Sequence, residues 1–145
     1  MYYGTIKYPD IANGSGVRVS LFVSGCTHHC KGCFQPETWD FNYGKLFDTE
    51  AENQILQYLD SPYVEGLSLL GGEPFEPSNC EILSRFARTV KNKYPDKTIW
   101  TYSGYRLEEL LQRKDSAVHD LLACTDILVD GEFVESKKDL TLVFR

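Results

Sequence analysis

Four short, apolar, β-rich runs, each followed directly by a glycine-containing loop, constrain the fold of this chain more than any other feature. The runs are Val17–Val23, Leu67–Leu70, Thr98–Tyr102 and Ile127–Val129, and segments with helical spacing of apolar residues separate them. Such alternation predicts a mostly parallel sheet with right-handed crossovers. A closed eight-stranded βα barrel needs about 250 residues. The 145 residues of this chain therefore favour an α/β fold with a partial, open βα barrel, as one domain spanning 1–145.

The connecting segments carry helix start signals. Thr49 and Glu52 have the spacing of a capping box, and Ser78 and Glu81 have the same spacing ahead of a second helix. Further helices are expected around Leu107–Leu111 and Val118–Leu122, with edge strands at Tyr2–Tyr8 and Leu140–Phe144.

The loops that follow the four runs are unusual in composition. They contain Cys26–Cys33, Gly71–Pro74, Ser103-Gly104 and Asp130-Gly131. Because the carboxyl ends of parallel strands lie at one edge of a sheet, and ligands of such folds bind there, all four loops are expected to form one site.

Cys26, Cys30 and Cys33 form a C-x3-C-x2-C triplet. The polar residues between them argue against a buried cysteine stripe, and a thiol-redox motif needs no third cysteine. Iron–sulfur clusters are normally held by four thiolates, so three would leave one iron open to a substrate. A zinc site remains the alternative, with the fourth ligand from His28, His29, Cys80 or Cys124.

Gly71-Gly72-Glu73-Pro74 follows an apolar strand directly. Two glycines allow a ligand to approach the backbone and to use its N–H and C=O groups. Glu73 adds a carboxylate, and Pro74 stiffens the turn. The alternative is an ordinary strand-to-helix turn.

Composition excludes several classes of protein. The net charge of −6 argues against non-specific binding to nucleic acid. No apolar stretch approaches the roughly 18 residues of a membrane span, and the first residues lack the pattern of a signal peptide. A cytoplasmic protein with reduced thiols is expected. Five cysteines, three of them bunched, fit metal binding better than disulfides.

The cysteine triplet and the Gly-Gly-Glu-Pro element together resemble the radical S-adenosylmethionine (SAM) superfamily. The resemblance implies a [4Fe–4S] cluster held by Cys26, Cys30 and Cys33, with SAM on the fourth iron. It also implies that Gly71, Gly72, Glu73 and Pro74 receive the amino group of SAM.

A narrower resemblance rests on Asn13–Arg18, Phe22–Cys26, Cys33–Phe41 and Leu128–Gly131. These segments are similar to the family of activating proteins of anaerobic ribonucleoside-triphosphate reductase. The family is a class of radical SAM oxidoreductases that cleave SAM reductively, and the 5′-deoxyadenosyl radical then generates a glycyl radical on the catalytic subunit of the reductase. The resemblance implies that subunit and a flavodoxin-type electron donor as partners, with no general base.

The remaining contacts to SAM are assigned by the same resemblance. Many superfamily members carry an aromatic residue before the third cysteine, where this chain has Gly32. The adenine contacts are therefore expected at Gly32, Cys33 and Phe34. Ser103 and Asp130 are candidates for the ribose, adenine or carboxylate of SAM, with ordinary turn chemistry as the alternative.

Several other residues have a plainer interpretation, and other functions fit parts of the pattern. Cys80 and Cys124 are expected to act as small hydrophobes, and His119 to be structural. Trp39 and Phe41 either form a partner surface or cover the cluster loop. The rival functions are an activase of another glycyl-radical enzyme such as formate acetyltransferase, a small-molecule radical SAM enzyme, a ferredoxin-like electron carrier and a zinc-stabilised binding module.

Overall fold

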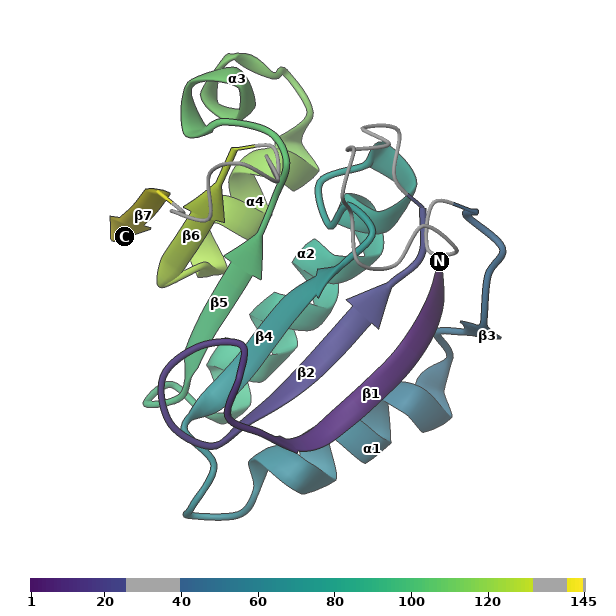
Figure 1. The fold of residues 1–145 in the computed structure, drawn as a ribbon, viewed down its shortest axis with the longest axis vertical. Coiled ribbons are helices and arrows are strands. Elements are labelled where there is room, and N and C mark those ends of the chain that lie inside the picture. The colour runs from purple at the N-terminus through teal and green to yellow at the C-terminus, as the bar shows by residue number, and fades with distance from the viewer. Residues whose placement is uncertain (26–39, 132–140, 145) are drawn as a thin grey trace.

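The computed structural model describes residues 1–25, 40–131 and 141–144. Strands and helices alternate along the chain after an N-terminal hairpin (Figure 1). The elements are β1 (Tyr2–Asp10), β2 (Arg18–Val23), β3 (Lys45–Leu46), α1 (Thr49–Leu59), β4 (Gly66–Gly71), α2 (Pro77–Lys93), β5 (Thr98–Tyr102), α3 (Leu107–Gln112), α4 (Ser116–Cys124), β6 (Ile127–Asp130) and β7 (Thr141–Phe144). Each of the four predicted core strands is present within one residue of the predicted bounds.

The strands form one sheet in the order β3-β1-β2-β4-β5-β6-β7. The four central strands, β2, β4, β5 and β6, pair in parallel, as the sequence predicted. β1 and β7 flank them in antiparallel pairing, and β3 is a two-residue addition to β1 that the sequence did not predict. In this register Val23 pairs with Gly71, so β2 and β4 end side by side.

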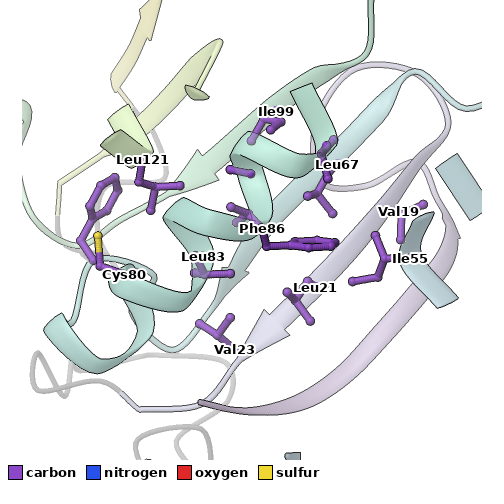
Figure 2. Packing of buried hydrophobic residues seen from close by; sticks show 14 of the residues in the cluster. Val19, Leu21, Val23, Ile55, Leu67, Cys80, Leu83, Phe86, Ile99 and Leu121 are labelled. Atoms are coloured by element: carbon purple, nitrogen blue, oxygen red, sulfur yellow. The ribbon is translucent and has the colours of Figure 1, made fainter. Parts of the chain in front are cut away.

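The core lies between the sheet and the helices, which cover one face of it (Figure 1). Alternate residues of each strand point to this face, so Val19, Leu21 and Leu67 are fully buried. Phe86 of α2 and Ile55 of α1 approach them from the helical layer (Figure 2). The alternation of apolar residues in the sequence therefore sets which face the helices cover.

The other sheet face carries polar residues at the amino ends of the strands. Arg18 is fully buried there, and Ser20 and Ser68 lie on the same face. The β1–β2 loop crosses in front of this end of the sheet (Figure 1), where the carbonyl oxygen of Asn13 accepts a hydrogen bond from Ser68 Oγ at 2.5 Å. This loop covers the amino end of the polar face.

Both predicted capping boxes were wrong, because neither Thr49 nor Ser78 is the N-cap of its helix. α1 is capped by Asp48, whose carboxylate accepts the N–H of Ala51 at 3.0 Å, so Thr49 is the first helical residue. α2 begins at Pro77 after the N-cap Glu76, so Ser78 lies inside the helix. In both cases a residue before the expected cap already has a side chain that is preferred at a helix start. For α1 this is a carboxylate at the N-cap, and for α2 it is a proline at the first helical position.

No helix among the described residues is long and apolar enough to cross a membrane.

Candidate functional site

The described residues that directly follow the four parallel strands lie at one edge of the sheet, the rim. Backbone hydrogen bonds join the loops in pairs. The loop after β4 joins that after β2 through Gly72 N–H to Val23 O and Glu73 N–H to Gly25 O, both 2.7 Å. The loops after β5 and β6 are joined by Gly131 N–H to Tyr105 O at 3.1 Å.

The two glycines of the Gly-Gly-Glu-Pro element allow a close approach of backbone to backbone. A Cβ atom on Gly72 would lie 2.6 Å from the carbonyl oxygen of Gly25. Gly71 has a φ of +105°, which favours glycine, and a Cβ there would meet Val23 at 2.7 Å. The segment that the glycines admit therefore includes Gly25, the residue directly before Cys26.

Glu73 is at the rim but its carboxylate is fully buried. Its oxygen Oε2 accepts Ser103 Oγ–H at 2.8 Å and the N–H of Phe75 at 3.0 Å, and Oε1 accepts the N–H of Gly104 at 2.7 Å. The residues that the sequence selected on two separate loops, Glu73 and Ser103, thus contact each other directly.

Asn79 was missed by the sequence analysis. It is buried in the first turns of α2, where its Nδ2 donates to Ser24 O at 2.8 Å and to Glu73 O at 3.0 Å. The signal was available in the sequence. Asn79 stands in the i, i+4, i+7 register of Leu83 and Phe86, and an amide on the apolar face of a helix requires buried partners.

Arg113 was also missed. Its guanidinium donates to the carbonyl oxygen of Phe75 at 2.8 Å and lies over the ring of Tyr105. It therefore links the α3–α4 connection to both the loop after β4 and the loop after β5. Its one local partner is Asp115, two residues on, which accepts Nη2–H at 2.7 Å. A local ion pair of this kind is also typical of a solvated arginine, so the local sequence gave no sign of the contacts with Phe75 and Tyr105.

Asp130 is the last residue of β6 and lies next to the segment that follows β5. Its oxygen Oδ2 accepts the N–H of Leu107, at the start of α3, at 2.8 Å. Within the described part of the chain, Oδ1 is buried and has no hydrogen-bond partner. A buried carboxylate oxygen without a donor is costly, which makes Asp130 a candidate to receive a donor from a ligand.

Phe41 lies against Gly25, the residue directly before Cys26. Gly25 has a φ of +100°, and a Cβ atom there would collide with the Phe41 ring. The ring is partly exposed, and the cysteine loop that it was expected to cover lies outside the described residues. Trp39 lies outside the described residues.

The cysteine triplet itself, with His28, His29, Gly32 and Phe34, lies outside the described residues. Among those that the structure does describe, no three His, Cys, Asp or Glu side chains are grouped as metal ligands. Cys80 is fully buried in the core, and burial raises the pKa of its thiol to about 12. Burial likewise raises the pKa of Cys124. Both are poor sources of thiolate, in line with their expected packing role.

His119 has a structural role, as expected. One ring nitrogen, Nε2, lies 2.7 Å from the carbonyl oxygen of Arg113. It therefore ties α4 to the preceding connection.

At the rim the structure thus brings together Gly25, Glu73 and Ser103, and comparison with known proteins gives the class of the chain. Residues 12–145 match the family model described as "4Fe-4S single cluster domain". The chain is thereby placed among proteins with a single 4Fe–4S cluster.

Curated relatives narrow the class. Proteins of Haemophilus influenzae and Pasteurella multocida are each 44% identical over 99% of this chain and 89% of their own length. A protein of Escherichia coli strain K12 is 39% identical over 95% of this chain and 89% of its own length. All three are named anaerobic ribonucleoside-triphosphate reductase-activating protein. This chain belongs to that family.

Proposed function

We propose that this protein activates an anaerobic ribonucleoside-triphosphate reductase by reductive cleavage of SAM at a [4Fe–4S] cluster. The observation that carries the proposal is the contact between the Gly71–Glu73 segment and Gly25, directly before the first cysteine of the triplet. A loop suited to SAM and a loop suited to the cluster are thereby joined, in a chain of the activating-protein family.

Cys26, Cys30 and Cys33 are the proposed cluster ligands. Three thiolates fit the 4Fe–4S class while leaving one iron for the amino and carboxylate groups of SAM. Asn79 and the Gly-Gly segment fix Ser24 and Gly25, so the cysteine loop starts from a rigid base. The adenine is proposed to lie against Gly32, Cys33 and Phe34.

The other proposed SAM contacts come from the loops after β4, β5 and β6. Backbone groups of Gly71–Pro74 are assigned to the amino group. Of the ribose, adenine and carboxylate of SAM, the ribose and adenine carry donors that oxygens of Ser103 and Asp130 can accept, so these two residues are assigned there. The unpaired Oδ1 of Asp130 supports its assignment as an acceptor for a hydroxyl or ammonium donor.

When bound, the cluster and SAM would supply the radical chemistry. One electron from the cluster would break the S–C5′ bond of SAM, giving methionine and a 5′-deoxyadenosyl radical, and that radical would take a hydrogen atom from a glycine Cα. The products are 5′-deoxyadenosine and a glycyl radical on the catalytic subunit of the reductase. A flavodoxin-type protein in the cytoplasm is the proposed source of the electron. The protein residues hold and orient the reactants, and the proposed fold is the partial barrel of the radical SAM superfamily.

The test is electron paramagnetic resonance of anaerobically reconstituted, dithionite-reduced protein, with and without SAM. A reduced [4Fe–4S] signal that changes on addition of SAM is expected. A cluster signal indifferent to SAM would point to electron transfer, and zinc without labile sulfide would point to a binding module.

The ligand assignment has its own test. Cys26→Ala is expected to abolish cluster binding and SAM cleavage, whereas Cys124→Ala, outside the triplet, retains both. Full SAM cleavage by the Cys26 variant would refute the assignment.

A further inference from the structure

We propose that Glu73 is a positioning residue: its carboxylate holds the loop after β5 against the loop after β4, and does not itself contact SAM. This inference rests on the proposed function and deepens it. The sequence places Glu73 in the element assigned to SAM, but the structure gives the carboxylate other partners.

The carboxylate is bound to donors of the protein on both of its oxygens. Two donors, Ser103 Oγ and Gly104 N–H, belong to the loop after β5, and a third, Phe75 N–H, belongs to the same loop as Glu73. With the residue fully buried, neither oxygen faces solvent where a ligand would arrive. Hydrogen bonds to an ionised carboxylate are stronger than neutral ones, so these bonds hold the two loops together firmly.

The backbone of Glu73 connects to the remaining partners. Its N–H donates to Gly25 O at 2.7 Å, and its carbonyl oxygen accepts Asn79 Nδ2 at 3.0 Å. One residue therefore joins the base of the cysteine loop, the start of α2 and the loop after β5. A shift of the β5 loop relative to the cysteine loop requires these bonds to break.

Ser103 gains its position from the same contact. Its Oγ donates to Glu73 and also accepts the N–H of Tyr105 at 3.0 Å. The hydroxyl proton is thus directed at Glu73, which fixes the orientation of Ser103 for any ligand at the rim. Glu73 acts on SAM binding through this serine and through Gly104.

Glu73→Gln is the sharpest variant because it keeps the size of the side chain and removes one acceptor. The Gln NH2 group must then face a donor, either Gly104 N–H or the pair of Phe75 N–H and Ser103 O–H. The matched control is Glu81→Gln, at an exposed position of α2. Both variants are reconstituted with the cluster as full-length chains.

Two readouts separate positioning from direct contact. Amide hydrogen exchange over residues 102–106, measured without SAM, reports how firmly Glu73 holds the loop after β5. The Kd for SAM reports how far SAM binding depends on that hold. For Glu73→Gln we expect faster exchange of this segment and unchanged iron and sulfide content. We also expect a Kd raised by about tenfold, because SAM must then order a loop that has lost the stabilisation of one hydrogen bond to a charged group. Glu81→Gln is expected to match wild type in all of these.

A second variant covers the case in which Glu73→Gln fails to fold. Ser103→Ala removes the hydrogen bond from Ser103 Oγ to Glu73, and only its amide exchange is measured. We expect exchange at Gly104 to be faster than in wild type, by less than in Glu73→Gln. Unchanged exchange in this variant would overturn the proposal that Glu73 holds this loop.

The other outcomes are distinguishable. A raised Kd with unchanged exchange in Glu73→Gln would make Glu73 a direct ligand of SAM and overturn the proposal. A Kd for SAM equal to that of wild type would also overturn it, because positioning by Glu73 would then not matter for SAM binding. Failure of the wild-type protein itself to bind SAM would overturn the proposed function, and this inference with it.

Discussion

The two ends of the parallel strands each contain a buried charged residue, but they use it differently. At the amino ends, Arg18 is fully buried and each of its five N–H groups has an acceptor, the oxygens of Ser15, Ser68 and Leu67 and both oxygens of Thr98. Burial lowers its pKa to about 10, which still leaves the guanidinium charged at neutral pH. This end is a closed network that links distant strands.

At the carboxyl ends the buried charges are carboxylates, and the loops rather than the strands are linked. Each end leaves one buried polar atom unpaired within the described residues: the indole N–H of Trp100 beside Arg18, and Oδ1 of Asp130 at the rim. An unpaired carboxylate oxygen is the more costly of the two. Burial of a charged residue is therefore common to both ends, whereas an incompletely paired carboxylate oxygen is found, among the described residues, at the rim.

Loss of Arg18 gives the largest expected effect on stability. Arg18→Met removes the donors from several buried oxygens at once, so the free energy of unfolding should fall by more than about 3 kcal/mol. Urea denaturation measures it, with Arg85→Met on the exposed side of α2 as the control. Because the rim is distant, the folded fraction should keep its SAM affinity. A variant as stable as the control would show that the network is dispensable.

Gly72→Ala tests the contact between loops at the rim. The added Cβ would collide with Gly25 O, so we expect a loss of stability of about 1–3 kcal/mol and reduced iron content, because the base of the cysteine loop must move. Gly131→Ala is the control without a collision, since no atom of the described residues lies within 4 Å of a Cβ atom there, while its φ of +98° favours glycine. It should cost about 1–2 kcal/mol from backbone strain and leave iron content unchanged. Equal iron loss in both variants would contradict the steric account.

Asn79→Leu is expected to have a smaller effect. It leaves two backbone carbonyls, those of Ser24 and Glu73, without their amide donor, at a cost of about 1–2 kcal/mol. Thermal or urea unfolding measures it, together with the rate at which the reconstituted protein loses iron. Asn53→Leu, on the exposed side of α1, is the control. Iron retention equal to that of the control would show that Asn79 does not help to hold the start of the cysteine loop.

The smallest expected effect is a pH dependence at the amino end. Burial of Asp10 raises its pKa, but hydrogen bonds from Ser20, Asn13 and Ala12, with the charge of Lys7, outweigh burial and hold the pKa below its ordinary value of 3.8. A lowered folded-state pKa stabilises the protein above 3.8, and this contribution is lost as the pH falls through the folded-state value.

Asp10→Asn should therefore be less stable than wild type at pH 7, with the difference shrinking below pH 4. Urea midpoints at several pH values measure it. A difference that stays constant with pH would assign the effect to hydrogen-bond geometry rather than to charge.

Much of this molecule follows from local sequence pattern. The strands β2, β4, β5 and β6 were predicted because apolar β-rich runs that end at glycine are short-range signals. The meeting of their loops followed from the parallel order alone. The N-caps Asp48 and Glu76 were missed because capping signals overlap within a few residues, and only backbone geometry selects among them.

The contacts between the loops at the rim could not be predicted in the same way. The sequence by itself determined the four parallel strands, the edge where their loops meet and the residue types on those loops. Only the tertiary structure decided that Gly72 packs on Gly25, that Glu73 binds Ser103 and Gly104, and that Asn79 holds Ser24. The physical reason is range: secondary structure depends on neighbours a few residues apart, whereas these contacts join residues 30 to 55 positions apart in the chain.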